Sequence, residues 1–134
     1  MSDPIVIVSA TRTPMGGFQG DFASLSCAQL GSVAIRAAVE RAGLKPEQVD
    51  EVIMGCVLPA GQGQAPARQA SLGAGLPLAA GCTTVNKMCG SGMRAAMYAH
   101  DMLLALTTLT SLSPLFLMTM KAPVAGALGG ARRT

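Results

Sequence analysis

The sequence predicts an α/β fold: a mostly parallel sheet with helices on its faces. Short, uncharged, β-branched runs alternate along the chain with amphipathic segments, and this order is typical of strands joined by crossover helices. The 134 residues are enough for one domain with a modest core. Only 3% of the residues are aromatic, so that core must be built from aliphatic side chains, Ala and Met.

The first expected element is a strand. Pro4 to Ala10 is a nearly continuous apolar run, which is typical of a parallel strand covered on both faces. It is followed by Thr11-Arg12-Thr13-Pro14 and by Gly16-Gly17, which predict a loop.

An amphipathic helix is expected next. Ser26 and Gln29 have the spacing of a capping box, in which each side chain binds the backbone of the other. Gly43 suits the position just after a helix, and Pro46 limits any continuation to a short turn. The predicted apolar face consists of Leu30, Val33, Ala34 and Ala37, broadened by Ile35 and Val39.

A second strand and a second helix come after this turn. Glu51 to Val57 predicts the strand, and Ala65 to Ala74 predicts the helix, with Pro66 in its first turn, where a missing N–H is tolerated. Arg68 and Gln69 are polar groups that could serve an active site. A solvated or interface face is the favoured interpretation of these two side chains.

The third strand and helix enclose the most informative stretch of the chain. Cys82 to Val85 is β-branched and uncharged, whereas Arg94 to Leu104 is rich in Ala, Met and Leu, which favour helices. The junction places Cys89 in the first helical turn, where free N–H groups and the helix dipole favour the nucleophilic thiolate.

Two glycines beside this cysteine favour a reactive role. Gly90 and Gly92 leave room for an acyl group and its carbonyl oxygen to approach the backbone. The alternative is that Cys89 is a small apolar core residue, as most free cysteines are.

Three stretches, in order, resemble the thiolase family of acetyl-CoA acetyltransferases and 3-ketoacyl-CoA thiolases. Residues 86–93, Asn-Lys-Met-Cys-Gly-Ser-Gly-Met, resemble the family's acyl-cysteine signature. Residues 7–14 resemble its opening strand and turn. Residues 55–59 and 63–70 resemble its second strand and the helix after it. The resemblance covers residues 4 to about 105.

This resemblance implies an incomplete thiolase-like N-terminal half. It implies an acyltransferase that passes acetyl or acyl groups between acyl-CoA and CoA, in the manner of fatty acid metabolism, with Cys89 carrying the acyl group as a thioester. Coenzyme A thioesters would be substrates, no cofactor would be bound, and a homo-oligomer would be expected. The resemblance assigns no residue of this chain to the coenzyme A pocket.

The catalytic set that the resemblance implies is incomplete. Acyl transfer through cysteine needs a base for the thiol proton and a second acid/base for the acceptor. In thiolases a histidine and a second cysteine of the C-terminal half fill these roles, and their motifs are absent here. His100 would lie roughly 16 Å from Cys89 along a helix rising about 1.5 Å per residue. Cys82 belongs to the preceding strand. The chain is therefore predicted to be inactive alone.

Two other functions stay open. The chain could be a non-catalytic interaction module that pairs with a complete subunit through its sheet edge and the helix of Arg68. It could also be a β-ketoacyl synthase relative, which would share the fold and the nucleophilic cysteine. The cysteine motif of that family differs from residues 86–89, so this hypothesis ranks last.

The sequence divides at residue 105. Residues 1–105 form the expected partial thiolase domain, and residues 106–134 an unmatched apolar tail without a clear helix or strand pattern. We interpret this tail as a frameshifted or disordered segment, because one choice of codons read in a shifted frame encodes an acidic turn and a valine-rich strand. The expected consequence is a sheet lacking its next strand. Ser, Thr and Pro114 make Met102 to Met120 a poor membrane span.

Composition argues against several classes of function. The formal charge of +3 is mild and its basic residues are scattered, so nucleic acid is not an expected partner. The four cysteines lack C-x-x-C spacing and a nearby histidine cluster, which argues against a metal site. No secretory signal pattern opens the chain, so we expect a cytoplasmic protein without membrane contact.

Overall fold

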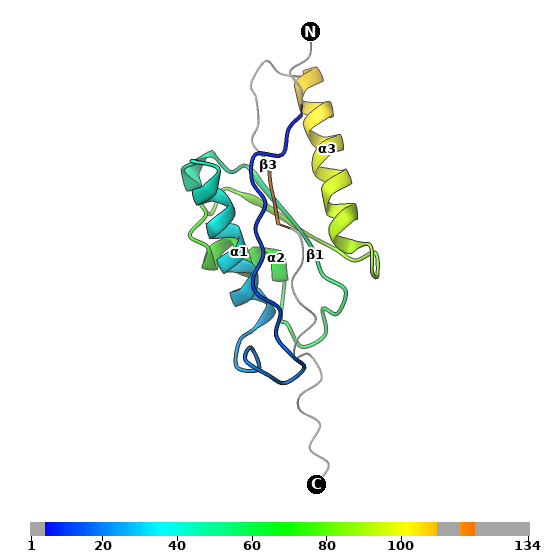
Figure 1. Ribbon diagram of the computed structural model, residues 1–134. Coiled ribbons are helices and arrows are strands. Elements are labelled where there is room, and N and C mark those ends of the chain that lie inside the picture. The colour runs from blue at the N-terminus through cyan, green and yellow to red at the C-terminus, as the bar shows by residue number, and fades with distance from the viewer. Residues whose placement is uncertain (1–4, 110–115, 120–134) are drawn as a thin grey trace.

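The protein is described by a computed structural model that covers residues 5–109 and 116–119, with side chains for residues 5–105. Its elements form three layers: a central sheet, α1 and α2 on one face, and α3 on the other (Figure 1). The elements, in order, are α1 (Cys27–Arg41), the 3-10 helix η1 (Pro46–Gln48), β1 (Glu51–Gly55), α2 (Pro66–Gly73), β2 (Gly81–Val85), α3 (Ser91–Leu109) and β3 (Phe116–Thr119).

The sheet has three strands in the order β2-β1-β3, and both strand pairs are parallel. Val52 of β1 is opposite Cys82 of β2 on one side and Leu117 of β3 on the other. The crossovers through α2 and α3 lie on opposite faces of the sheet. This arrangement confirms the predicted α/β class with a parallel sheet and flanking helices.

Local signals fix the ends of α1 as predicted. The Ser26 hydroxyl accepts a hydrogen bond from Gln29 N at 3.2 Å, and Ser26 N donates to Gln29 Oε1 at 2.7 Å. At the other end Gly43 has a φ of +68°, which glycine adopts at little cost, and the chain turns there toward η1.

The buried face of α1 differs from the predicted one at Val33, which is 57% exposed. Ile35 is fully buried, and a residue two positions away points to nearly the opposite side of a helix. The reason is the close approach of α2, where a Cβ at Gly31 would lie 3.1 Å from that of Ala70. This contact sets the rotation of α1 about its axis and leaves Val33 outside.

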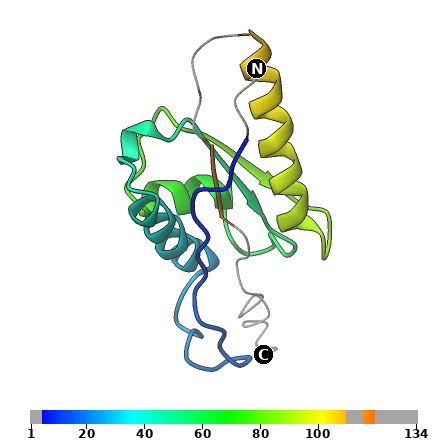
Figure 2. The same ribbon diagram turned by 45° about the horizontal axis from the view of Figure 1, so that its top comes forward.

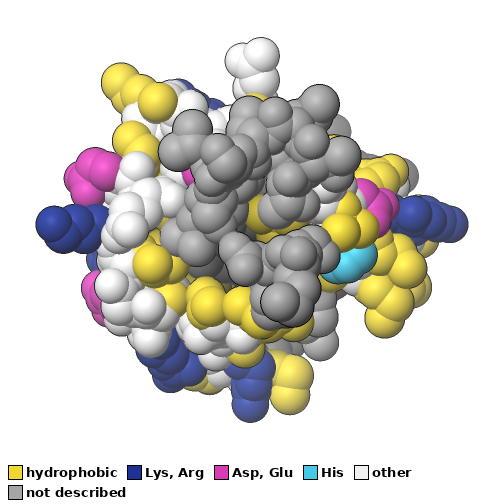
Figure 3. Space-filling view, turned by 90° about the horizontal axis from the view of Figure 1, so that it is seen from above, with side chains coloured by type: hydrophobic (Ala, Val, Ile, Leu, Met, Phe, Trp, Pro, Cys, Tyr) yellow, Lys and Arg dark blue, Asp and Glu magenta, His cyan; other side chains and the backbone are white. Residues whose placement is uncertain are grey.

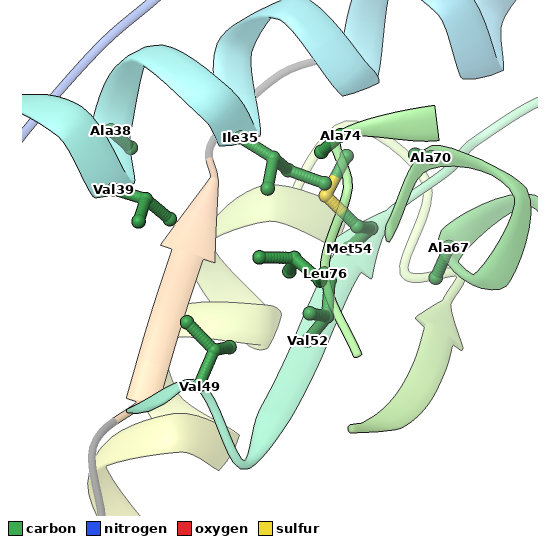
Figure 4. Close-up of a cluster of buried hydrophobic side chains, with 10 residues drawn as sticks. All are labelled: Ile35, Ala38, Val39, Val49, Val52, Met54, Ala67, Ala70, Ala74 and Leu76. Atoms are coloured by element: carbon green, nitrogen blue, oxygen red, sulfur yellow. The ribbon is translucent and has the colours of Figure 1, made fainter. Parts of the chain in front are cut away.

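Two hydrophobic clusters hold the layers together. The larger lies between α1, α2 and β1 (Figure 4), and comprises Ile35, Ala38, Val39, Val49, Val52, Met54, Ala67, Ala70, Ala74 and Leu76. The smaller joins α3 to the other face of the sheet through Ile53, Val85, Ala95 and Ala99. As expected from the composition, neither cluster contains an aromatic side chain.

The predicted first strand is wrong for the residues described. Residues 5–10 are extended but pair with no strand, and Val6, Ile7 and Val8 are 63%, 84% and 56% exposed. Instead the segment is held against α1, where Thr11 Oγ1 donates to Ala34 O at 2.8 Å (Figure 2). The edge of β1 that a further strand could use is already paired with β3.

The predicted division at residue 105 falls inside α3, which continues to Leu109. The expectation that the tail lacks strand structure is wrong for Phe116–Thr119, because these residues pair with β1. The sheet therefore does have a further strand, β3, which pairs with β1 on the side opposite β2. The remainder of the tail, residues 110–115 and 120–134, lies outside the described residues, so its interpretation as frameshifted or disordered stays a prediction.

Candidate active site

The candidate nucleophile lies on a tight turn between β2 and α3. Asn86 Oδ1 accepts a hydrogen bond from Met88 N at 3.0 Å, and Met88 adopts a left-handed φ of +47°. Asn86 Nδ2 also donates to Val57 O at 3.0 Å, which ties the turn to the loop after β1. An Asn side chain that closes a turn in this way restricts the backbone conformations of the turn before any ligand binds.

Ser91, the first residue of α3, stabilises the same turn through hydrogen bonds of its hydroxyl group. Its hydroxyl donates to Met88 O at 2.7 Å and accepts from Lys87 N at 2.9 Å. Ser91 is only 3% exposed, whereas Lys87 and Met88 are exposed, so both bonds are partly buried. Cys89 is thus held between two anchored positions, Met88 and Ser91.

The amino end of α3 packs directly against the carboxyl end of β1. A Cβ added at Gly55 would lie 2.5 Å from Gly92 N and 2.6 Å from Ser91 C, so only glycine permits this approach. Beside this contact, Cys56 N donates to Val85 O at 2.9 Å. The carboxyl ends of β1 and β2 therefore meet the amino end of α3 at one edge of the sheet, a common place for ligand sites in parallel α/β folds.

Cys89 itself is exposed and lies two residues before α3 begins at Ser91. The predicted placement within the first helical turn is therefore wrong by a short distance. The helix starts after Gly90, whose carbonyl accepts the first helical hydrogen bond from Arg94 N at 2.9 Å. The thiol follows the strand and precedes the helix, at the end where α3 leaves backbone N–H groups without helical partners.

The other thiols have different surroundings. Cys56 is buried, with its sulfur 3.6 Å from Gln62 Oε1. Cys27 is partly buried, and its burial, together with nearby Cys56, raises the pKa of its thiol. Cys82 lies in β2 as predicted, with its sulfur 3.6 Å from Ala80 O. None of these three combines the exposure and the turn position of Cys89.

His100 does not reach Cys89. It lies on α3 with an exposed side chain, and its Nδ1 is 3.2 Å from Asp101 Oδ1. This agrees with the prediction that His100 is a helix-surface residue and not the base for Cys89. Among the described residues, no group of three or more His, Cys, Asp or Glu side chains is arranged to hold a metal ion.

The side chains of Arg68 and Gln69 donate hydrogen bonds to backbone carbonyls of their own chain. Arg68 Nη1 donates to Ala80 O and Nη2 to Leu78 O, each at 2.8 Å, which secures the loop before β2. Gln69 Nε2 donates to Gln62 O and Gln64 O at 2.8 and 2.7 Å. Gln69 is exposed and Arg68 is half-buried, in agreement with the predicted solvated or interface face for Gln69, while the polar groups of both side chains bind carbonyls of the same chain. An interface role for these two residues stays a prediction.

The comparison with protein families decides where this chain belongs. The family described as "Thiolase, N-terminal domain" matches residues 5–108, which include β1, β2, the turn of Cys89 and nearly all of α3. The chain belongs to the thiolase family.

Several relatives of this thiolase chain are mitochondrial acetyl-CoA acetyltransferases. The protein from Rattus norvegicus is 58% identical over 100 residues, which is 75% of this chain and 24% of the relative. The protein from Homo sapiens is 56% identical over 100 residues, covering 75% of this chain and 23% of the relative. The thiolase chain thus spans about a quarter of the length of the curated relatives it matches.

Solved structures of thiolases resemble this chain in fold as well as in sequence. The Acat5 thiolase from Ascaris suum, solved in complex with coenzyme A, has a TM-score of 0.72 and 38% identity, covering 74% of this chain and 26% of that one. The acetyl-CoA acetyltransferase from Syntrophomonas wolfei has a TM-score of 0.71 and 38% identity, covering 75% and 25%. The three-layer α/β arrangement of this thiolase chain is therefore that of an incomplete thiolase fold.

Sequence reasoning singled out Cys89 but not the residues that hold its turn. The double role of Ser91 and the bond from Asn86 to Val57 O emerge only from the structure. A signal was present for Ser91, because a serine just before an Ala- and Met-rich run is typical of a helix start.

None of the helices in the described parts of the chain is both long and apolar enough for a membrane span.

Proposed function

We propose that this thiolase chain carries the nucleophile of an acyltransferase of the acetyl-CoA acetyltransferase type. The Cys89 thiolate would attack the carbonyl carbon of an acyl-CoA. The bond from that carbon to the coenzyme A sulfur would break, leaving an acyl-cysteine thioester, and CoA would leave as its thiol after taking up a proton. In condensation, the α-carbon of a second acetyl-CoA would lose a proton and attack the thioester, forming a carbon–carbon bond as the Cys89 thiolate leaves. In the reverse direction, Cys89 would attack the 3-keto carbon of acetoacetyl-CoA, the bond between carbons 2 and 3 would break to release acetyl-CoA once carbon 2 takes up a proton, and CoA would take the acyl group from Cys89.

One observation carries this proposal. Cys89 is exposed on a turn fixed by Asn86 and Ser91, where two parallel strands end and α3 begins. An attacking thiol needs access for the acyl group and a fixed position, and this turn provides both. Coenzyme A as substrate is supported by the bound coenzyme A in the Ascaris suum thiolase.

The described residues offer Cys89 no base. The exposed imidazole of His100 lies more than two turns along α3, beside Asp101. We therefore infer that the base and the acceptor acid/base come from the part of a thiolase that this chain does not span, so that the chain alone is inactive. The cytoplasmic location remains a proposal; the names of the closely matching vertebrate relatives place those proteins in mitochondria.

A chimera tests the proposal. Residues 5–108 of this chain would replace the matching segment of a related acetyl-CoA acetyltransferase, and thiolysis of acetoacetyl-CoA would be measured. We expect activity that Cys89→Ala abolishes and that the matched variant Cys82→Ala retains. An active, folded chimera that tolerates Cys89→Ala would disprove the assignment.

The second function is an interaction module that pairs with a complete subunit. The free outer edge of β2 favours it, since among the described strands only β1 pairs with β2. Arg68, the other part of that hypothesis, is bound to carbonyls of its own chain. Co-expression with a tagged complete acetyltransferase tests it: stable co-purification supports the module, and its absence at high expression contradicts it.

A further inference from the structure

A single residue, Gln62, closes the loop that follows β1. Its side-chain Nε2 donates to Leu58 O at 2.6 Å, and its Oε1 accepts from the buried thiol of Cys56, whose sulfur lies 3.6 Å away. Its backbone is paired as well, because Gln62 N donates to Pro59 O at 3.1 Å and Gln62 O accepts from Gln69 Nε2 at 2.8 Å. All four polar groups of Gln62 therefore hold this loop in one conformation.

The closed loop meets the turn of Cys89 through a carbonyl next to the one that Gln62 binds. Asn86 Nδ2 donates to Val57 O at 3.0 Å, and the following carbonyl, that of Leu58, is the one bound by Gln62 Nε2. Successive planar peptide units share a Cα atom and only two rotatable bonds, so a bond that fixes one unit restricts the next. Gln62 therefore limits how Val57 O can turn relative to Asn86.

Asn86 connects this loop to the residue before the nucleophile. While its Nδ2 binds Val57 O, its Oδ1 accepts from Met88 N at 3.0 Å, and Met88 directly precedes Cys89. An amide side chain is planar, so a displaced Val57 carbonyl either rotates both ends of the amide or loses its bond. The hydrogen bonds from the loop to the turn thus form one continuous series that ends beside the thiol.

This series holds groups in place and moves no proton. Its members are amide and backbone groups, which do not act as acids or bases near neutral pH. The single histidine of the chain takes no part in it: its side chain lies at the surface in the view from above (Figure 3), and its Nδ1 is 3.2 Å from Asp101 Oδ1. What the series supplies to the Cys89 thiol is a fixed position.

We propose that Gln62 is a positioning residue for Cys89, acting through the loop after β1 and through Asn86. This inference rests on the proposed function, in which Cys89 is the nucleophile. A reacting atom displaced by about 1 Å can slow a reaction about 100-fold, even when the altered residue is far from the chemistry. Because Gln62 acts on the position of the thiol, its loss lowers kcat and leaves KM nearly unchanged.

Thiolysis of acetoacetyl-CoA by the chimera that carries residues 5–108 of this chain tests the effect on rate. We expect Gln62→Ala and Gln62→Glu each to lower kcat about tenfold, with KM within about twofold of the parent value. Gln62→Glu has nearly the size of the original side chain and keeps an acceptor for Cys56, but its carboxylate has no donor for Leu58 O. This variant therefore separates loss of the hydrogen bond from loss of packing.

The matched control is Gln48→Ala. Gln48 Oε1 accepts from Lys45 N at 2.9 Å, so this exposed glutamine also closes a short segment of its own chain. It belongs to η1, outside both the loop after β1 and the turn of Cys89. We expect the Gln48→Ala chimera to keep the kcat of the parent.

Amide hydrogen exchange of the full 134-residue chain tests the path itself. Met88 N is the last donor of the series, so its exchange should be about tenfold faster in both Gln62 variants. Exchange at Ile35 N, in the buried part of α1, reports opening of the whole fold and should stay the same. Equal acceleration of both amides in both variants would show a general loss of stability and overturn the proposal.

A double-mutant cycle joins the two ends of the series. In the Asn86→Ala background, Gln62→Ala should change kcat little, because the connection to Met88 is already broken. Fully additive effects, a rise in KM at unchanged kcat, or a kcat equal to that of Gln48→Ala would each overturn the positioning role. Cys89→Ala in the same chimera separates this failure from failure of the proposed function, because only the latter leaves that variant active.

Discussion

Cys89 differs from the other three thiols of the chain in its access to solvent. It is exposed, whereas Cys56 is buried and Cys27 and Cys82 are partly buried. Burial also raises the pKa of the Cys27 thiol, so less of it is thiolate near neutral pH. We therefore expect iodoacetamide to alkylate Cys89 first, with Cys27 gaining reactivity only as the pH rises beyond the usual thiol pKa of about 8.5.

Mass-spectrometric mapping of the four sites against time measures this order. Mapping in denaturant is the control, because unfolding should bring the four rates together. If Cys89 reacted last in the folded chain, the main support for its role as nucleophile would be lost.

The second prediction for a single residue concerns the contribution of Ser91 to the stability of the fold. Ser91→Ala removes the acceptor of Lys87 N and one donor to Met88 O, both in part-buried hydrogen bonds. Loss of a typical intramolecular hydrogen bond costs about 0.5–1.5 kcal/mol. We expect the free energy of unfolding to fall by that amount in urea titrations, while Ser24→Ala, at an exposed serine, leaves it nearly unchanged. Equal stability of both variants would show that the hydroxyl does not fix the turn.

At the scale of elements, the contact between β1 and α3 depends on Gly55. Gly55→Ala would place a methyl group 2.5 Å from Gly92 N, a backbone atom that cannot move without shifting α3. Overpacking of this kind costs about 1–3 kcal/mol. The control Gly17→Ala meets nothing within 4 Å and should cost much less.

Two measurements check the Gly55 variant. Urea titration gives its loss of stability, and alkylation of Cys89 reports whether the turn has moved with the helix. A Gly55→Ala protein as stable as the Gly17→Ala protein would show that α3 does not approach β1 this closely.

At the scale of the whole molecule, the prediction is that this chain alone is inactive. The chain spans 24% of the length of the Rattus norvegicus acetyltransferase, and among its described residues no base lies beside Cys89. A nucleophile without its proton acceptor leaves most of the barrier in place. We expect the purified chain to show no detectable cleavage of acetoacetyl-CoA by CoA. Robust turnover that Cys89→Ala abolishes would show that the chain supplies its own base.

Much of the fold was predictable because its signals are local. The capping box of Ser26 and Gln29, the turn at Gly43 and the proline that opens α2 each act within a few residues. The candidate site was predictable in part, since the motif around Cys89 singled out the residue that the structure places exposed on the turn before α3. Its supports were not, because the bond from Asn86 to Val57 O joins residues 29 positions apart.

The sequence by itself determined the α/β class, the approximate position of β1, β2 and the helices, the thiolase family and the choice of Cys89. Only the tertiary structure decided that residues 5–10 stay unpaired, that Arg68 binds the carbonyls of Leu78 and Ala80, and that α3 begins after Cys89. The physical reason is that a helix takes its hydrogen bonds from nearby residues, whereas a strand needs a partner from elsewhere in the chain. The apolar run at residues 5–10 predicts a strand, but these residues pair with none of the described strands, and Val6, Ile7 and Val8 stay exposed.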